Sequence, residues 1–124
     1  MQPRLKSSFW VDALVRRAAM SGASAFITHK GDAERGDVLI KIARLNGEAA
    51  VLAPSPMMSD TRSFDWLPEA GVWSPEREVD ELIRRRQGYD PDLWVVEIED
   101  RDGRHFLTEP VNGEPDSREH GPKA

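Results

Sequence analysis

The sequence contains no cysteine. This absence excludes disulfide bonds, a thiolate nucleophile and zinc sites that need cysteine ligands. The chain also lacks any apolar run close to the roughly 18 residues that a membrane-spanning helix requires. No apolar segment follows the basic residues at the start of the chain, so we expect neither a signal peptide nor a membrane span. The absence of a targeting signal favours the cytoplasm as the location of the protein.

Aromatic residues make up only 7% of the chain, and the net charge at pH 7 is -5. An acidic chain repels the phosphate backbone, which argues against nucleic-acid binding. Hydrophobic residues nevertheless account for 39% of the 124 residues, enough for one hydrophobic core. We therefore predict a single domain over residues 1–107. Residues 108–124 combine prolines, glycines and acidic residues with few apolar side chains, and we expect a disordered acidic tail there.

Two segments show the apolar repeat of three and four residues that is typical of an amphipathic helix. The first spans residues 9–20, and we expect one of the two serines before it to cap its amino end. The second spans residues 75–87, with Ser74 as a favourable cap and Pro75 at its first position. Its acidic residues lie in the first half and its arginines in the second, which suits the helix dipole.

Alternation of apolar and polar residues predicts the strands. The clearest lies at residues 93–99, where Trp94, Val96 and Ile98 share one face. The Asn46–Gly47 pair predicts a type I′ turn between two other strands, because both central residues of that turn need positive φ. A second hairpin is expected to join residues 93–99 to a last strand. The remaining strand candidates are residues 25–28, 38–43, 48–53, 64–67 and 104–107.

The predicted element order is α-β-β-β-(β)-α-β-β. Because hairpin connections join neighbouring strands, we expect an α+β fold with a mostly antiparallel sheet of five or six strands and two amphipathic helices. The alternative is a three-layer arrangement with one helix on each face of the sheet.

Three stretches of sequence resemble a known family. They are Arg4-Leu5 followed by Phe-Trp-Val-x-Ala-Leu-x-Arg-Arg at residues 9–17, the loop Gly-Asp-Ala-x-x-Gly at residues 31–36 with its Val-Leu-Ile-Lys-Ile strand, and Asp-Pro-Asp-Leu-Trp-Val-Val-Glu-Ile-Glu-Asp at residues 90–100. Over roughly residues 4–107 the chain is similar to the alphaproteobacterial domain-of-unknown-function family DUF1491. The resemblance implies a bacterial, single-domain protein, and it supplies no catalytic residue.

The first candidate site is the loop from His29 to Gly36. Its glycines permit close backbone approach, and its charged side chains would suit a small anionic ligand. The loop lacks the Gly-Lys-Ser/Thr ending of a P-loop, so a solvated connection between strands is the simpler interpretation. A small enzyme or ligand-binding protein that uses this loop on an anionic metabolite is the alternative function. The candidate ligand-binding residues are His29, Lys30, Asp32, Arg35 and His105.

The second candidate is an interaction surface. Met57 and Met58 lie in an irregular segment, and Trp66 and Trp73 flank the next one. Adaptable methionines and exposed aromatics are typical of protein-binding surfaces, although the tryptophans could instead cover the core. No catalytic motif is complete and no spacing matches a metal site, so we predict neither metal nor cofactor. The sequence favours a non-enzymatic binding or protein-interaction module with an unknown protein partner.

Overall fold

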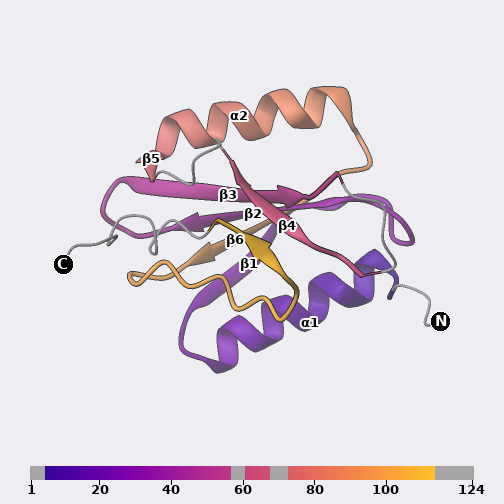
Figure 1. Cartoon of the computed structure of the whole chain (residues 1–124), viewed down its shortest axis with the longest axis horizontal. Helices are drawn as coiled ribbons and strands as arrows, with labels where there is room; N and C mark the ends of the chain where they lie inside the picture. The colour runs from indigo at the N-terminus through magenta and orange to yellow at the C-terminus, as the bar shows by residue number, and fades with distance from the viewer. Residues whose placement is uncertain (1–4, 57–60, 68–72, 114–124) are drawn as a thin grey trace.

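The computed structural model describes residues 5–56, 61–67 and 73–113. These residues form one sheet and two helices (Figure 1). Neither helix of this part of the chain has the length and apolar character needed to cross a membrane. The elements are α1 (Ser7–Met20), β1 (Ser24–His29), β2 (Val38–Ala43), β3 (Glu48–Pro54), β4 (Phe64–Leu67), β5 (Ser74–Pro75), α2 (Glu76–Tyr89), β6 (Trp94–Glu99) and β7 (Val111–Asn112).

The sheet has seven strands in the order β1-β6-β2-β3-β4-β7, with β5 paired to the start of β3. The β2–β6 and β4–β7 pairs are parallel, and the other pairs are antiparallel. The predicted α+β class is confirmed, with one more strand than the larger predicted number. The parallel β2–β6 pair arises because the chain crosses over through α2 before it re-enters the sheet beside β2.

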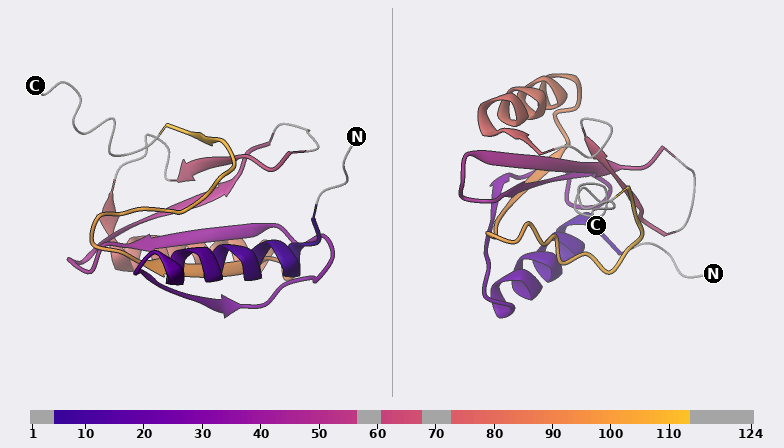
Figure 2. Two further views of the ribbon diagram at one scale, coloured as in Figure 1. Left: turned by 90° about the horizontal axis from the view of Figure 1, so that it is seen from below. Right: turned by 60° about the vertical axis from the view of Figure 1, so that its left-hand side comes forward.

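The two helices lie on opposite faces of the sheet, so the three-layer alternative describes the arrangement (Figures 1 and 2). Successive strand residues point to opposite faces, and both faces of β2 and β6 are therefore covered. All six residues of β2 are buried as a result. The core on the α1 side includes Trp10, Leu14, Ile40, Phe64, Val96 and Ile98. The core on the α2 side includes Leu39, Val51, Val79, Ile83 and Val95.

Helix α1 begins at Ser7, two residues earlier than predicted, and neither serine hydroxyl caps it. The Ser7 hydroxyl donates instead to the carbonyl oxygen of Gly36 at 2.6 Å. The backbone N–H groups of Ser7 and Ser8 donate to the carbonyl oxygens of Glu34 and Ala33, at 3.3 and 2.9 Å. The predicted side-chain cap is therefore wrong, because carbonyl groups of a distant loop occupy the first-turn amides.

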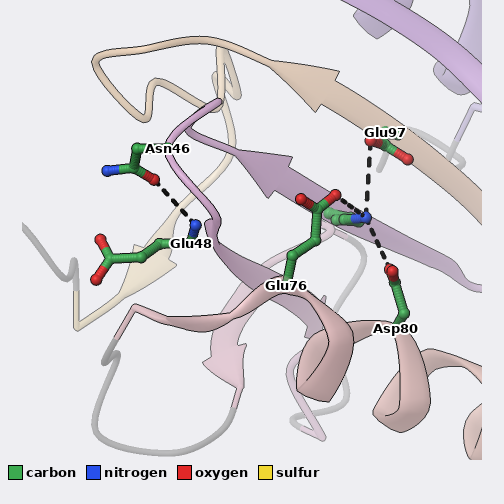
Figure 3. Close-up of polar contacts among 6 residues, drawn as sticks. Asn46, Glu48, Glu76, Asp80 and Glu97 are labelled. Atoms are coloured by element: carbon green, nitrogen blue, oxygen red, sulfur yellow. Dashed lines mark hydrogen bonds and ion pairs between the residues drawn. The ribbon is translucent and has the colours of Figure 1, made fainter.

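The predicted type I′ turn at Asn46–Gly47 is also wrong. The backbone N–H of Arg44 donates to the carbonyl oxygen of Glu48 at 3.0 Å, which leaves three residues in the loop. Positive φ occurs at Leu45 and Gly47, at 66° and 91°, and not at Asn46. The Asn46 side chain instead accepts the N–H of Glu48 at 2.9 Å (Figure 3), a local bond that stabilises the longer loop.

Residues 104–107 form no strand, contrary to the prediction. The carboxylate of Asp100 accepts the backbone N–H of Arg104 at 2.8 Å and its guanidinium at 2.7 Å, and these bonds turn the chain away from β6. Phe106 then has a φ of 62°, which lies outside the strand region. The sheet resumes only at β7, within the segment predicted as a tail. The domain boundary at residue 107 stays a prediction, and residues 114–124 lie outside the described part of the chain.

The Asp100–Arg104 contact predicts an acid-sensitive contribution to stability. Hydrogen bonds from Arg104 lower the pKa of Asp100 below its ordinary value of 3.8, against the opposing effect of burial. Because the folded-state pKa is the lower one, the contact stabilises the fold above the unfolded-state pKa and is lost as the pH falls through the folded-state pKa. We expect Asp100→Asn to cost about 1 kcal/mol near neutral pH and less at an acidic pH below 3.8, where the carboxylate begins to lose its charge.

Urea unfolding at the two pH values, followed by circular dichroism, measures this difference. Asp102→Asn is the matched control, because Asp102 is exposed and forms no ion pair among the described residues. An equal loss of stability for Asp100→Asn at both pH values would show that the charge of the carboxylate is not the source of the effect.

Candidate functional site

The amides of the predicted ligand loop are already used within the fold. The Asp32 N–H donates to the carbonyl oxygen of Asp92 at 2.9 Å. The Asp32 carboxylate accepts the N–H groups of Glu34 and Arg35, at 3.2 and 2.8 Å. The N–H of Gly36 donates to the carbonyl oxygen of Asp32 at 3.1 Å. An anion-binding nest needs backbone amides that point outward, and these four amides do not supply one.

Close packing explains both glycines of the loop. A Cβ added at Gly31 would lie 2.1 Å from the carbonyl oxygen of Asp92 and 2.7 Å from the Trp94 ring. A Cβ added at Gly36 would lie 2.4 Å from the same carbonyl oxygen. The Trp94 indole N–H donates to the carbonyl oxygen of Asp32 at 2.7 Å, which fixes the loop against the start of β6. The loop is thus packed tightly between the start of α1 and the start of β6.

The two histidines lie in different parts of the sheet. His29 ends β1, and its Nδ1 lies 2.8 Å from the carbonyl oxygen of Leu93. The His105 ring packs beside Trp66 of β4, with ring centroids 6.1 Å apart, and its Nδ1 accepts the N–H of Leu107 at 2.9 Å. Strands β6, β2 and β3 separate β1 from β4. The structure therefore does not bring His105 to the loop.

A cleft of about 260 Å³ lies between α1 and the end of β1. Among the predicted ligand-binding residues, only Lys30 lines it. Asp32 and Arg35 are exposed on the loop, and His29 is half-buried. Over the ranges that the structure describes, no group of three or more His, Asp or Glu side chains could hold a metal ion. The lining residues of the cleft are Ser8, Asp12, Ile27, Lys30, Gly31, Ala33 and Trp94.

Trp66 and Trp73 are core residues, so they do not form the exposed surface considered for them. Their side chains are 4% and 7% exposed, and their rings lie 5.9 Å apart between centroids. Strand β4 turns Trp66 inward because its alternate residues face the α1 side of the sheet. The Arg44 guanidinium covers the Trp73 ring at 4.8 Å. Met57 and Met58 lie outside the described residues.

Sequence reasoning missed a buried ionic cluster on the α2 side of the sheet. Lys41, in the middle of β2, is only 5% exposed. Its Nζ lies 2.7 Å from a carboxylate oxygen of Glu76, 2.7 Å from one of Asp80 and 3.7 Å from one of Glu97. Figure 3 shows Glu76, Asp80 and Glu97 converging on this amine from α2 and β6. We call these four residues the Lys41 cluster. The sequence signal for this cluster was a lysine inside an otherwise apolar strand.

The Lys41 cluster anchors α2 to the sheet. Burial alone would lower the pKa of Lys41, but hydrogen bonds to Asp80 and Glu76 outweigh it and raise the pKa above the ordinary 10.5. Burial also raises the pKa of Glu97 above 4.5, and the positive charge of Lys41 offsets this only in part. A lysine held protonated is not a nucleophile, so the geometry does not suit Schiff-base chemistry. The cluster has a structural role.

Strand β1 leaves one edge of the sheet open. It pairs with β6 on one side, and no strand of the described ranges pairs with its other side. Natural edge strands often carry charged residues or proline, and β1 has neither, although an irregular register between Ile27 and His29 disturbs its end. Phe26 lies opposite Glu97 and is 41% exposed. Figure 2 shows β1 alone at this margin of the sheet.

The open edge borders the margin of the α2-side face, beyond the strands on which α2 packs. Directly opposed residues of an antiparallel pair point to the same face, so Phe26 shares the face of Glu97 and of Lys41. Helix α2 packs on β2, β3 and β5. The neighbouring residues of β1, Ala25 and Ile27, pack instead into the core on the α1 side. The candidate functional site is thus the β1 edge together with this margin of the face.

Comparisons with known proteins place the chain in a family. The family model "Protein of unknown function (DUF1491)" matches residues 5–108. A crystal structure of a DUF1491 family protein from Caulobacter crescentus is 43% identical, with a TM-score of 0.78, over 87% of this chain and 99% of that one.

An NMR structure of a DUF1491 family protein from Caulobacter crescentus is 42% identical, with a TM-score of 0.77, over 90% of this chain and 99% of that one. A solution structure of a protein from A. tumefaciens is 31% identical, with a TM-score of 0.73, over 90% of this chain and 98% of that one. No curated protein matches. The family match covers most of the sequence, and the chain therefore belongs to the DUF1491 family.

Proposed function

We propose that the protein is a non-enzymatic protein-interaction module that binds a partner strand at the open edge of β1. The observation that carries the proposal is the unpaired edge of β1, with Phe26 exposed beside it. An extended segment can add to such an edge, where backbone hydrogen bonds supply affinity and alternate side chains supply specificity. A strand that covers the exposed part of the Phe26 ring would gain about 1 kcal/mol from apolar burial.

The alternative, an enzyme or ligand-binding protein that uses the loop, has less support. Four loop amides are bonded within the fold, two of them to the carboxylate of Asp32, and Asp32 and Arg35 are exposed. His105 lies beside β4, far from the loop in strand order. The β1 edge, in contrast, has backbone groups for which the described fold supplies no strand partner.

Phe26→Asp tests the proposal, because it places a charge where a partner strand would pack. We expect the wild-type protein to retain partners from an extract of its own cells, and Phe26→Asp to retain at least ten-fold less of them. Tyr89→Asp is the matched control, since Tyr89 is 88% exposed but lies at the end of α2. Affinity capture followed by quantitative mass spectrometry and size-exclusion chromatography measures the difference.

Circular dichroism first establishes that both variants fold. If Phe26→Asp then binds the same proteins in the same amounts as Tyr89→Asp, the β1 edge is not the binding surface.

A further inference from the structure

We infer that the strand bound at the β1 edge is a basic one, an extended segment of a partner protein in which cationic and apolar residues alternate. The inference rests on the proposed function and adds the chemistry of the partner. Two observations carry it: the margin of the α2-side face beside β1 is acidic, and the opposite side of the same edge is bordered by a partly apolar cleft.

The acidic character of this face comes from β6 and α2. Glu97 lies opposite Phe26, and Glu99 lies opposite Ser24, so both carboxylates share the face on which Phe26 is exposed. Glu99 is half-buried and takes part in no ion pair among the described residues. Lys41 supplies the face with one cation, which Glu76 and Asp80 already hold at 2.7 Å.

The carboxylates of Glu76, Asp80, Glu97 and Glu99 outnumber the amine of Lys41 in this group of residues. Burial is the largest cause of the raised pKa of Glu97, and the charges of Glu76, Glu99 and Asp80 raise the pKa further. The positive charge of Lys41 is the second largest cause and acts in the opposite direction, but the pKa of Glu97 is still raised overall. A second cation on this face would therefore be attracted by more than one carboxylate.

A strand added to β1 can deliver that cation. It would lie about 4.8 Å from β1, and its residue opposite Phe26 would point to the acidic face. A lysine or arginine there can lay its aliphatic stem along the Phe26 ring and extend its charge toward Glu97 and Glu99. The next residue of the strand would point to the α1 side, beside Ile27 and the cleft of about 260 Å³. Alternation of cationic and apolar residues follows from this two-sided geometry.

A second copy of the chain fits this edge less well. Strand β1 has the sequence Ser-Ala-Phe-Ile-Thr-His, with no lysine or arginine. If the β1 strands of two copies paired, neither strand would therefore place a lysine or arginine near Glu97 or Glu99. The charge of the face favours a basic segment of a different protein.

The test uses three capped peptides of about seven residues that alternate valine with lysine, with glutamine or with glutamate. Each is added to the full-length, ¹⁵N-labelled protein. We expect the valine–lysine peptide to slow the hydrogen exchange of the β1 amides and the glutamate peptide to leave it unchanged. Glu99→Gln should weaken the binding of the valine–lysine peptide about three-fold. Glu78→Gln is the matched control, because Glu78 is exposed on α2.

Where a peptide does bind at β1, two results would overturn the inference. One is equal binding of the lysine and glutamine peptides at β1, which would leave edge binding intact and remove the role of charge. The other is an equal loss of affinity for Glu99→Gln and Glu78→Gln, which would reveal non-specific attraction to an acidic protein. Absence of β1 protection by every peptide also overturns it, and the partner retention of Phe26→Asp then shows separately whether the proposed function survives.

Discussion

Replacement of Lys41 by methionine is expected to destabilise the fold by about 3 kcal/mol, because it removes the cation of a buried ionic cluster. Methionine has a similar length and keeps the apolar contacts of the lysine stem. The main cost arises at Glu97, whose side chain is only 16% exposed and would lose its counter-charge. Glu76 and Asp80, at 40% and 43% exposure, can turn toward water and therefore contribute less.

Urea unfolding near neutral pH measures the loss. Lys30→Met is the matched control, because Lys30 is an exposed lysine on the loop, and we expect it to change stability by less than about 0.5 kcal/mol. The double variant Lys41→Met/Glu97→Gln should recover more than half of the loss, since the uncompensated carboxylate is gone. A double variant as unstable as Lys41→Met would show that packing, and not charge, is the source.

The pH dependence of this prediction has two parts. In the wild-type protein the pKa of Lys41 is raised, so its contribution is present below its unfolded-state pKa of about 10.5 and is lost as the pH rises through the folded-state value. The pKa of Glu97 is also raised above 4.5, so the folded protein takes up its proton more readily than the unfolded chain. Removal of Lys41 strengthens this effect, and Lys41→Met should therefore regain stability as the pH is lowered from about 7 to 5.

Local sequence patterns predicted the elements of the fold but not their arrangement. Apolar spacing located both helices to within about two residues, and the strand candidates located β1, β2, β3, β4 and β6. The parallel pairing of β2 with β6 joins residues that are far apart in the chain, and no local pattern specifies it. Residues 104–107 alternate like a strand, yet the contact between Asp100 and Arg104 directs them out of the sheet.

The candidate site shows the same limit. The sequence identified the glycine-bounded loop as unusual. Its glycines are required by close packing against Asp92 and Trp94, which only the tertiary fold brings near the loop. Lys41 looked like the polar member of an alternating strand, although the acidic first turns of α2 bury and neutralise it. The open edge of β1 follows from the strand order, which the sequence did not reveal.

Replacement of Gly31 by alanine is expected to cost about 3 kcal/mol or more, because the new methyl group would meet the backbone of the two residues that precede β6. The added Cβ would lie 2.1 Å from the carbonyl oxygen of Asp92 and 2.7 Å from the carbonyl carbon of Leu93. Neither is the end of an adaptable side chain. The loop would have to move away from β6, and the hydrogen bond from the Asp32 N–H to Asp92 would break.

That movement would also reach helix α1, because carbonyl groups of the same loop accept the N–H groups of Ser7 and Ser8. We therefore expect Gly31→Ala to lower the urea midpoint and to speed hydrogen exchange at the start of α1. Gly88→Ala is the matched control: its Cβ would meet nothing within 4 Å inside α2, and alanine there should stabilise by about 0.5–1 kcal/mol. A variant Gly31→Ala as stable as the wild type would show that the loop is not packed tightly between α1 and the start of β6.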